Sequence, residues 1–306
     1  MPPSSSTPRW HLPAYLGGLA TLTAVAADHY LDIIKWKRIR YTVPIDDNNK
    51  IAVSLRARTR PPPIGQMEWP GGRFLLQYLL DECNFASSGA ILEIGAGIGL
   101  TSCGLAKARR EHLNNHSPII ATDYDEPSLQ LLRSNAAENE CSDIVKVAHW
   151  DAASGDKALQ TLPIKLSELS HIIASDVVYH GFGVETDPSG DGLPKTLSAL
   201  LHAKPSLDVT ILLTDRFSGG AVAAFSGAAG VNTATAVPTT VDPELARFEA
   251  TCHGLGLRVR REPMPRAVLE RVASSQWPLA RFYWWMAGWY EEESGMSVVR
   301  VELDDG

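Results

Sequence analysis

A glycine-rich turn is the part of this sequence best suited to binding chemistry. GAGIG (95–99) follows an apolar strand candidate at 90–95 that carries Glu93. Such a turn lets the backbone approach a ligand closely at the N-terminus of a helix. Dinucleotide enzymes use GxGxxG, whereas here the third glycine comes one residue early and Leu100 stands where that fingerprint needs glycine or alanine. The spacing is therefore an acidic-x-GxGxG form. A lone glycine-rich turn is weak evidence of function, so residues in the neighbouring elements must point to the same ligand.

Two residues at other strand ends agree with a nucleoside ligand. Asp123 closes the strand candidate at 118–124, where a carboxylate can accept hydrogen bonds from both hydroxyls of a ribose. Trp150 closes the candidate at 144–150 and puts an indole at the carboxyl edge of the sheet, where it could pack on adenine. A strand-end aspartate alone is more often a helix cap, so the register of Asp123 with the glycine turn is what favours ribose binding.

A carboxylate and a phenol follow the next strand candidate, at 171–179. Asp176 and Tyr179 are three positions apart at the same edge of the sheet, so both can face a group that is being transferred. A helix cap for Asp176 and edge packing for Tyr179 are the alternatives.

Together these segments resemble methyltransferase family 16, the seven-strand lysine methyltransferases that modify chaperones, elongation factors and similar non-histone proteins. The resemblance covers roughly residues 60–216 and is carried by EWPGG (68–72), LEIGAGIGL (92–100), ATDYDEPSLQLLRSNAAEN (121–139), the strand ending in Trp150 and ASDVVY (174–179). The paired glycine and DxxY motifs make it fairly specific. The departures are Asp151, where many members have glycine, a long insertion at 217–240 and an N-terminal extension.

The resemblance implies S-adenosyl-L-methionine as the cofactor and assigns roles to matching residues. The family's cofactor contacts fall on Trp69 near the methionine end, Glu93, Gly95, Gly97 and Gly99 at the turn, Asp123 at the ribose and Trp150 at the adenine. Its DxxY signature falls on Asp176 and Tyr179, which we expect to orient the target amine and to wall the lysine channel.

The elements that must position these residues form an alternating pattern of strands and helices. After residue 88, short β-branched runs alternate with longer helical segments, which is typical of a parallel sheet flanked by helices. We expect an α/β, Rossmann-like, seven-strand class I methyltransferase fold, mostly parallel, with helices on both faces. Its strands are expected at 90–95, 118–124, 144–150, 171–179, 209–215, 257–263 and 297–303, and its helices at 73–83, 99–113, 127–139, 156–169, 195–203 and 242–256.

Composition divides the chain into three parts. Residues 1–34 form an N-terminal extension with a disordered start and a short apolar helix, 35–60 a basic β-hairpin, and 61–306 the methyltransferase domain with a flexible insertion at 217–240. The hairpin region holds eight Lys and Arg against two Asp, so a solvated hairpin without a partner and a contact surface for an acidic partner are both open interpretations. The aromatic segment at 281–290 is ambiguous between strand and helix, and its density is typical of core packing.

The charge and the cysteines exclude several function classes. A net charge of −7 argues against nucleic acid as a partner, which leaves a protein or a small molecule as substrate. The apolar segment at 12–27 is interrupted by proline and glycine and is shorter than the ~20 residues of a membrane span. We expect no metal site and reduced, buried thiols, since no CxxC pair occurs among Cys83, Cys103, Cys141 and Cys252. Reduced thiols are typical of a reducing compartment, so we expect a cytoplasmic location, with the nucleus or mitochondrion as alternatives.

The predicted activity is therefore methyl transfer from S-adenosylmethionine to a lysine side chain of a non-histone protein. A small-molecule methyltransferase and a cofactor-binding assembly factor without catalysis are the alternatives. Methylation of a nucleic-acid base is disfavoured because SDVVY (175–179) replaces the Asn/Asp-Pro-Pro-aromatic sequence of such enzymes.

Overall fold

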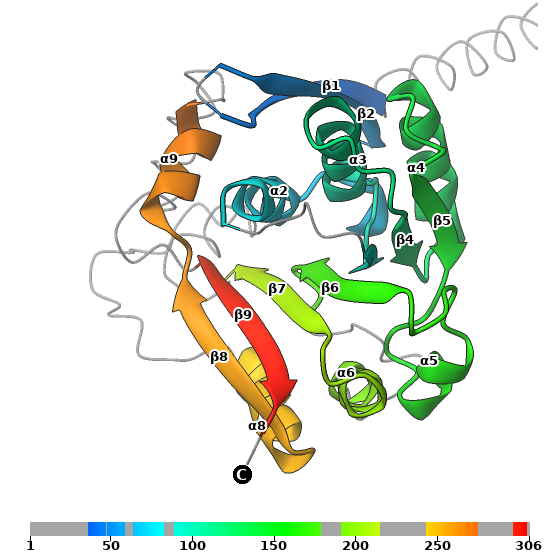
Figure 1. Ribbon diagram of the computed structural model, residues 1–306, viewed down its shortest axis with the longest axis vertical. Helices are drawn as coiled ribbons and strands as arrows, with labels where there is room; N and C mark the ends of the chain where they lie inside the picture. The colour runs from blue at the N-terminus through cyan, green and yellow to red at the C-terminus, as the bar shows by residue number, and fades with distance from the viewer. Residues whose placement is uncertain are drawn as a thin grey trace, which may run out of the picture.

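The described part of the chain contains one seven-stranded sheet and a separate two-stranded hairpin (Figure 1). The computed structural model describes residues 36–46, 48–58, 64–82, 89–178, 191–214, 243–274 and 296–304. The large sheet has the order β5-β4-β3-β6-β7-β9-β8. Its strands are β3 (Ala90–Ile94), β4 (Ile119–Asp123), β5 (Val145–His149), β6 (Leu169–Ser175), β7 (Asp208–Thr214), β8 (Leu257–Pro263) and β9 (Met296–Leu303).

Strand order places a ligand site at the carboxyl ends of β3 and β6. Strands β3 to β7 are parallel, and β9 runs antiparallel between β7 and β8. The chain moves from β3 outward through β4 to β5 and then returns to the other side of β3 to form β6. Ligands bind at such a reversal of strand order in open α/β sheets. The predicted seven-strand, mostly parallel sheet is confirmed.

Alternating strand side chains build a core on each face of the sheet. Ile91, Ile119 and Ile173 pack toward one face, and Leu92, Ile120 and Ile172 toward the other. The first face is covered by α2 (Pro70–Glu82), α3 (Leu100–His112), α4 (Glu126–Glu138) and α9 (Arg266–Ser274), and the second by α5 (Asp156–Gln160), α6 (Gly192–Ala203) and α8 (Pro243–Gly254).

The predicted basic hairpin is present as β1 (Trp36–Pro44) and β2 (Lys50–Arg58), paired antiparallel. Asp46 shapes the turn between them, since one of its oxygens accepts from the amides of Asn48 and Asn49 at 2.8 Å each. Figure 1 shows the hairpin as a further layer over the helices of the first face, from α9 to α4. Its inward side chains are buried in the core of that face, among them Tyr41, Val53 and Leu55. The hairpin is therefore packed onto the fold.

Two predicted elements end several residues earlier than expected. The strand expected at 171–179 starts at Leu169 and stops at Ser175, because Asp176 has a left-handed φ of 55° that turns the chain out of the sheet. The helix expected at 156–169 ends at Gln160, and Pro163, which cannot donate a backbone hydrogen bond, follows in a turn.

Several predictions fall on residues outside the described part of the chain. These are the N-terminal extension 1–34, Tyr179, the insertion at 217–240 and the aromatic segment 281–290. Among the helices that are described, none has the length and apolar character needed to cross a membrane.

Candidate functional site

The glycine turn after β3 has the conformation that its sequence requires. Gly95, Gly97 and Gly99 have φ values of 65°, 52° and 84°, in the left-handed region that side chains with a Cβ rarely adopt. Gly99 is the N-cap of α3 and supplies no side-chain cap, so the first turn of this helix relies on other acceptors for its amides. A Cβ on Gly97 would lie 3.1 Å from the carbonyl oxygen of Gly65, so the backbone at Gly65 packs closely against the turn.

Glu93 lies under this turn and ties it to α3. Its carboxylate is buried and accepts a hydrogen bond from the Ser102 hydroxyl, while its carbonyl accepts one from Thr122 Oγ1 at 2.6 Å. Burial raises the pKa of Glu93 to about 7, although the bonds from Ser102 and Thr101 oppose the rise. Glu93 therefore supports the turn from below.

Asp123 joins the turn to the end of β4. Its Oδ2 accepts from the Gly97 amide and its Oδ1 from the Asp125 amide, both at 3.0 Å. The side chain is largely buried, and this burial raises its pKa. A carboxylate has about four acceptor positions, so Asp123 has capacity for ribose hydroxyls beyond these two amides.

A short 3-10 helix, η1 (Ile64–Gln66), covers this carboxylate, and sequence reasoning missed it. A Cβ on Gly65 would lie 2.5 Å from Ser128 Oγ and 3.9 Å from Asp123 Oδ2. Ser128 belongs to the first turn of α4, whose N-cap Asp125 accepts from the Ser128 amide at 3.0 Å. The glycine after PPPI in the linker was the available signal.

Trp150 lies at the predicted strand end, but its indole is already engaged. Its backbone amide donates to the Asp123 carbonyl at 3.1 Å, and its indole Nε1 donates to the Ala158 carbonyl at 3.0 Å. The side chain is only 3% exposed and packs in the core beneath α5 and α6. Tyr124, directly after Asp123, is 51% exposed, so the aromatic ring more open to a ligand was missed by sequence reasoning.

The segment EWPGG meets the end of β6. The Asp176 amide donates to the Leu212 carbonyl at 2.9 Å, which fixes the left-handed residue to the neighbouring strand. A Cβ on Gly71 would fall within 3.0 Å of both Asp176 Oδ2 and Ser175 Oγ. Successive side chains of a strand normally point to opposite faces, so the left-handed turn is what brings this neighbouring pair to the same glycine. The buried Ser175 Oγ has no hydrogen-bond partner in the described structure.

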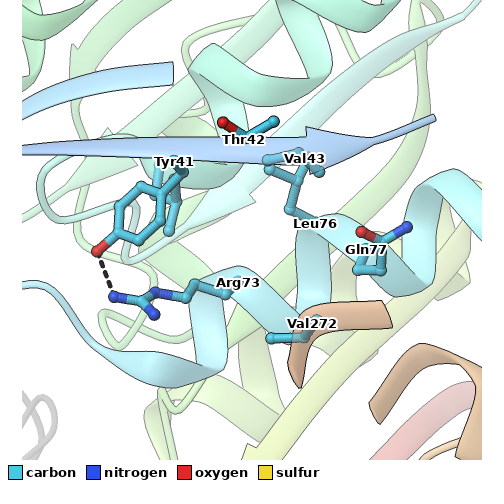
Figure 2. A pocket seen from close by; sticks show the side chains of 8 residues that line it. Tyr41, Thr42, Val43, Arg73, Leu76, Gln77 and Val272 are labelled. Atoms are coloured by element: carbon cyan, nitrogen blue, oxygen red, sulfur yellow. Dashed lines mark hydrogen bonds between the residues drawn. The ribbon is translucent and has the colours of Figure 1, made fainter. Parts of the chain in front are cut away.

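A polar network holds EWPGG in place. Arg73 donates to the Tyr41 hydroxyl (Figure 2) and stacks 4.1 Å from the centre of that ring. It also pairs with Glu68, which directly precedes Trp69. Burial and the Glu68 charge raise the Tyr41 pKa, so the phenol stays a neutral partner. Figure 2 shows Tyr41 and Arg73 beside a small hollow between β1, α2 and α9, which no predicted site residue lines. The residue before Trp69 is thus anchored from the hairpin side.

The structure brings most of the predicted residues to one edge of the sheet. Gly95 lies against Val177, since an added Cβ would be 2.8 Å from Val177 Cγ1, so the glycine turn and the Asp176 segment are neighbours. This turn at the reversal of strand order, the carboxylate at the end of β4 and the antiparallel β9 are features of the class I methyltransferase fold.

The chain belongs to the lysine methyltransferase family, whose sequence model matches residues 47–218. It is 34% identical over 164 residues to proteins from two strains of Cryptococcus neoformans var. neoformans serotype D, B-3501A and JEC21, each named "Protein N-terminal and lysine N-methyltransferase EFM7". The match covers 51% of this chain and 50% and 49% of theirs, so the chain spans about half the length of these curated relatives.

Solved structures resemble this chain more distantly. The [4+2]-cyclase SpnF is 19% identical with a TM-score of 0.45, over 80% of this chain and 86% of its own. A SAM dependent methyltransferase from Aquifex aeolicus is 13% identical with a TM-score of 0.45, over 77% of this chain and 94% of its own.

The residues present fit S-adenosylmethionine, the cofactor predicted from the sequence. The left-handed glycine turn leads into the N-terminus of α3, which has no side-chain cap, and Asp123 stands beside the turn with acceptor capacity left. Family membership agrees with this cofactor.

Proposed function

We propose that this methyltransferase modifies the side-chain amine of a lysine in a non-histone protein. The observation that carries the proposal is the Asp176 carboxylate, held by a left-handed backbone beside the glycine turn and against the start of α2. Membership of the lysine methyltransferase family and the names of the relatives support the same acceptor.

The proposed cofactor contacts are those expected from the sequence. The turn of Gly95, Gly97 and Gly99 with Glu93 beneath it would hold the cofactor, with Asp123 at its ribose and Trp69 at its methionine end. Trp150, whose indole is buried in the core, would lie behind its adenine. When bound, S-adenosylmethionine supplies an electrophilic methyl group on a sulfonium.

The acceptor must be a neutral amine aligned with that methyl group. We assign Asp176 to orient the amine and to stabilise the positive charge that develops on its nitrogen. Tyr179, three residues later, would offer its ring face to the same cation.

The outward face of the hairpin would contact the protein substrate. Arg38 is 68% exposed and pairs with Glu138 at 3.1 Å, whereas the exposed Arg40 and Lys50 have no ion-pair partner within the described residues. On a chain of net charge −7, such cations favour a partner with an acidic surface rather than nucleic acid. Charge reversal of Arg40 and Lys50 should raise KM for the protein and leave kcat unchanged, with reversal of Lys165 as the matched control.

A labelled-methyl assay tests the acceptor class. The chain and its Asp176→Asn variant are incubated with labelled S-adenosylmethionine and cell extract, and products are separated into protein and small molecules. We expect a labelled protein band that depends on Asp176, and mass spectrometry should place the label on a lysine. Label confined to small molecules, or no transfer despite cofactor binding, would contradict the proposal and favour a small-molecule enzyme or an assembly factor.

A protein N-terminal amine is a second candidate acceptor, because the relatives' names include it. The same carboxylate would orient either amine. Peptide mapping of the labelled protein separates the two, since blocking the α-amino group by acetylation removes only N-terminal labelling.

We also propose that the enzyme works in the cytoplasm, with the nucleus and mitochondrion as alternatives. Cys103, Cys141 and Cys252 are buried free thiols, which suits a reducing compartment. Cell fractionation with an antibody to the full chain tests this location.

A further inference from the structure

Asn135 of α4 and Asn139, the C-cap of that helix, close the open edge of β2. The Asn139 side chain accepts from the Ser54 amide at 2.9 Å and donates to the Ser54 carbonyl at 2.6 Å. The Asn135 side chain accepts from the Arg56 amide at 2.8 Å and donates to the Arg56 carbonyl at 3.2 Å. One turn of helix advances about 6 Å over four residues, close to the rise of two residues in a strand, so the two amides can act as a third strand of the hairpin.

Asn135 makes one further bond that Asn139 does not make. Its side-chain nitrogen also donates to the carbonyl of Ile98 at 2.9 Å, inside the glycine turn. The extra donation of Asn139 goes instead to the Asn135 carbonyl of its own helix, at 2.8 Å. Asn135 is 0% exposed, and its amide thus joins the hairpin directly to the cofactor turn.

The Ile98 carbonyl is a sensitive point of that turn. Ile98 stands between Gly97 and Gly99, and its carbonyl shares a planar peptide unit with the Gly99 amide. The Gly99 amide donates to the Ala96 carbonyl at 2.8 Å, so the peptide is held from both sides. Glycines on either side have little steric preference, so this bond restricts a peptide that would otherwise rotate more freely.

We infer that Asn135 is a positioning residue for the cofactor, through which the basic hairpin and the glycine turn are coupled. The hairpin is then part of the cofactor-binding apparatus as well as a covering layer. This inference does not depend on which amine accepts the methyl group, because its readout is cofactor binding alone.

Asn135→Ala and Asn139→Ala form a matched pair. Each variant removes three hydrogen bonds, two of them part-buried and one buried, and the two positions lie one helical turn apart against the same strand. Both should lower the melting temperature similarly. Calorimetry should show S-adenosylhomocysteine binding weakened about tenfold, or about 1.4 kcal/mol, by Asn135→Ala. We expect a change within about twofold for Asn139→Ala. Equal losses in the two variants would overturn the inference.

Two further measurements keep the test informative if Asn135→Ala does not fold. Asn135→Asp keeps the shape and the acceptor for the Arg56 amide but loses the donor to the carbonyls of Ile98 and Arg56, so its cofactor affinity should fall as well. In the unmodified chain, S-adenosylhomocysteine should slow hydrogen exchange at the Arg56 amide more than at the Ser54 amide, because linkage is reciprocal. Equal slowing at both amides would also overturn it.

Discussion

Replacing Gly71 with alanine should displace the Asp176 carboxylate without changing β6 itself. A Cβ at this position would come within 3.0 Å of Asp176 Oδ2 and Ser175 Oγ, closer than carbon and oxygen approach in proteins. Oδ2 is the end of a side chain that can rotate, so it is the carboxylate rather than the helix that should give way. Gly72 is the matched control, because its Cβ would find Thr101 Oγ1 at 3.6 Å and Leu100 Cδ2 at 3.7 Å, which is ordinary contact.

The size of the effect follows from the displacement. The carboxylate has to move by on the order of 1 Å, and a misplacement of that size at a reacting centre can cost about a hundredfold in rate. Stability should respond differently, since alanine is favoured over glycine in a helix by up to about 1 kcal/mol. Gly71→Ala should therefore lower kcat about a hundredfold with little change in melting temperature. Gly72→Ala should leave kcat unchanged.

Three measurements decide between the explanations. Turnover is measured as labelled methyl transfer to extract protein, cofactor affinity by calorimetry with S-adenosylhomocysteine, and stability by thermal melting. Full turnover in Gly71→Ala would refute the claim that the position of Asp176 matters. A loss of cofactor affinity as large as the loss of turnover would show that this carboxylate serves the cofactor and not the acceptor.

Substitutions of four other residues test the remaining roles. Asp123→Ala should weaken S-adenosylhomocysteine binding by roughly 1–3 kcal/mol in calorimetry, because two charge-assisted hydrogen bonds to the ribose hydroxyls are lost. Unchanged affinity would show that Asp123 does not bind the ribose. Asp176→Asn should lower turnover about a hundredfold and hardly change cofactor affinity. Abolished cofactor binding in Asp176→Asn would count against the acceptor role of this carboxylate. At the next position of the motif, Tyr179→Phe should lower turnover less than Tyr179→Ala. The pKa of Glu93 is raised from 4.5 to about 7 in the folded protein. Between these two pH values the folded protein keeps a proton on Glu93 that the unfolded chain has lost. The stability of the free protein should therefore fall as pH rises from 4.5 to 7. Thermal melts of Glu93→Gln should lose that pH dependence, and an identical fall in both proteins would assign it to other groups.

Local pattern predicted the elements well because their signals lie within a few residues. The alternation in KIAVSLRAR (50–58) gave β2 with Ile51, Val53 and Leu55 inward, and the glycine spacing gave the turn before α3. The end of β6 was mispredicted because Asp176 follows an apolar strand and precedes two valines, so periodicity extends through it. Its left-handed backbone is stabilised by the Leu212 carbonyl, a contact from a neighbouring strand that no local pattern contains.

The contacts that complete the site all join segments distant in sequence, which is why single motifs described it only in part. Asn135 lies 79 residues from Arg56 and 37 from Ile98, and no spacing rule links three such positions. EWPGG resembles a cofactor motif, yet the structure gives its members separate tasks: Glu68 pairs with Arg73 beneath the hairpin, and Gly71 leaves room for Asp176. Both tasks place the hairpin and the start of α2 around the sheet edge where the glycine turn lies. A substitution in the hairpin interior, such as Tyr41→Ala, should therefore reach the site through Arg73 and Glu68, since it removes the hydroxyl and the ring that hold Arg73.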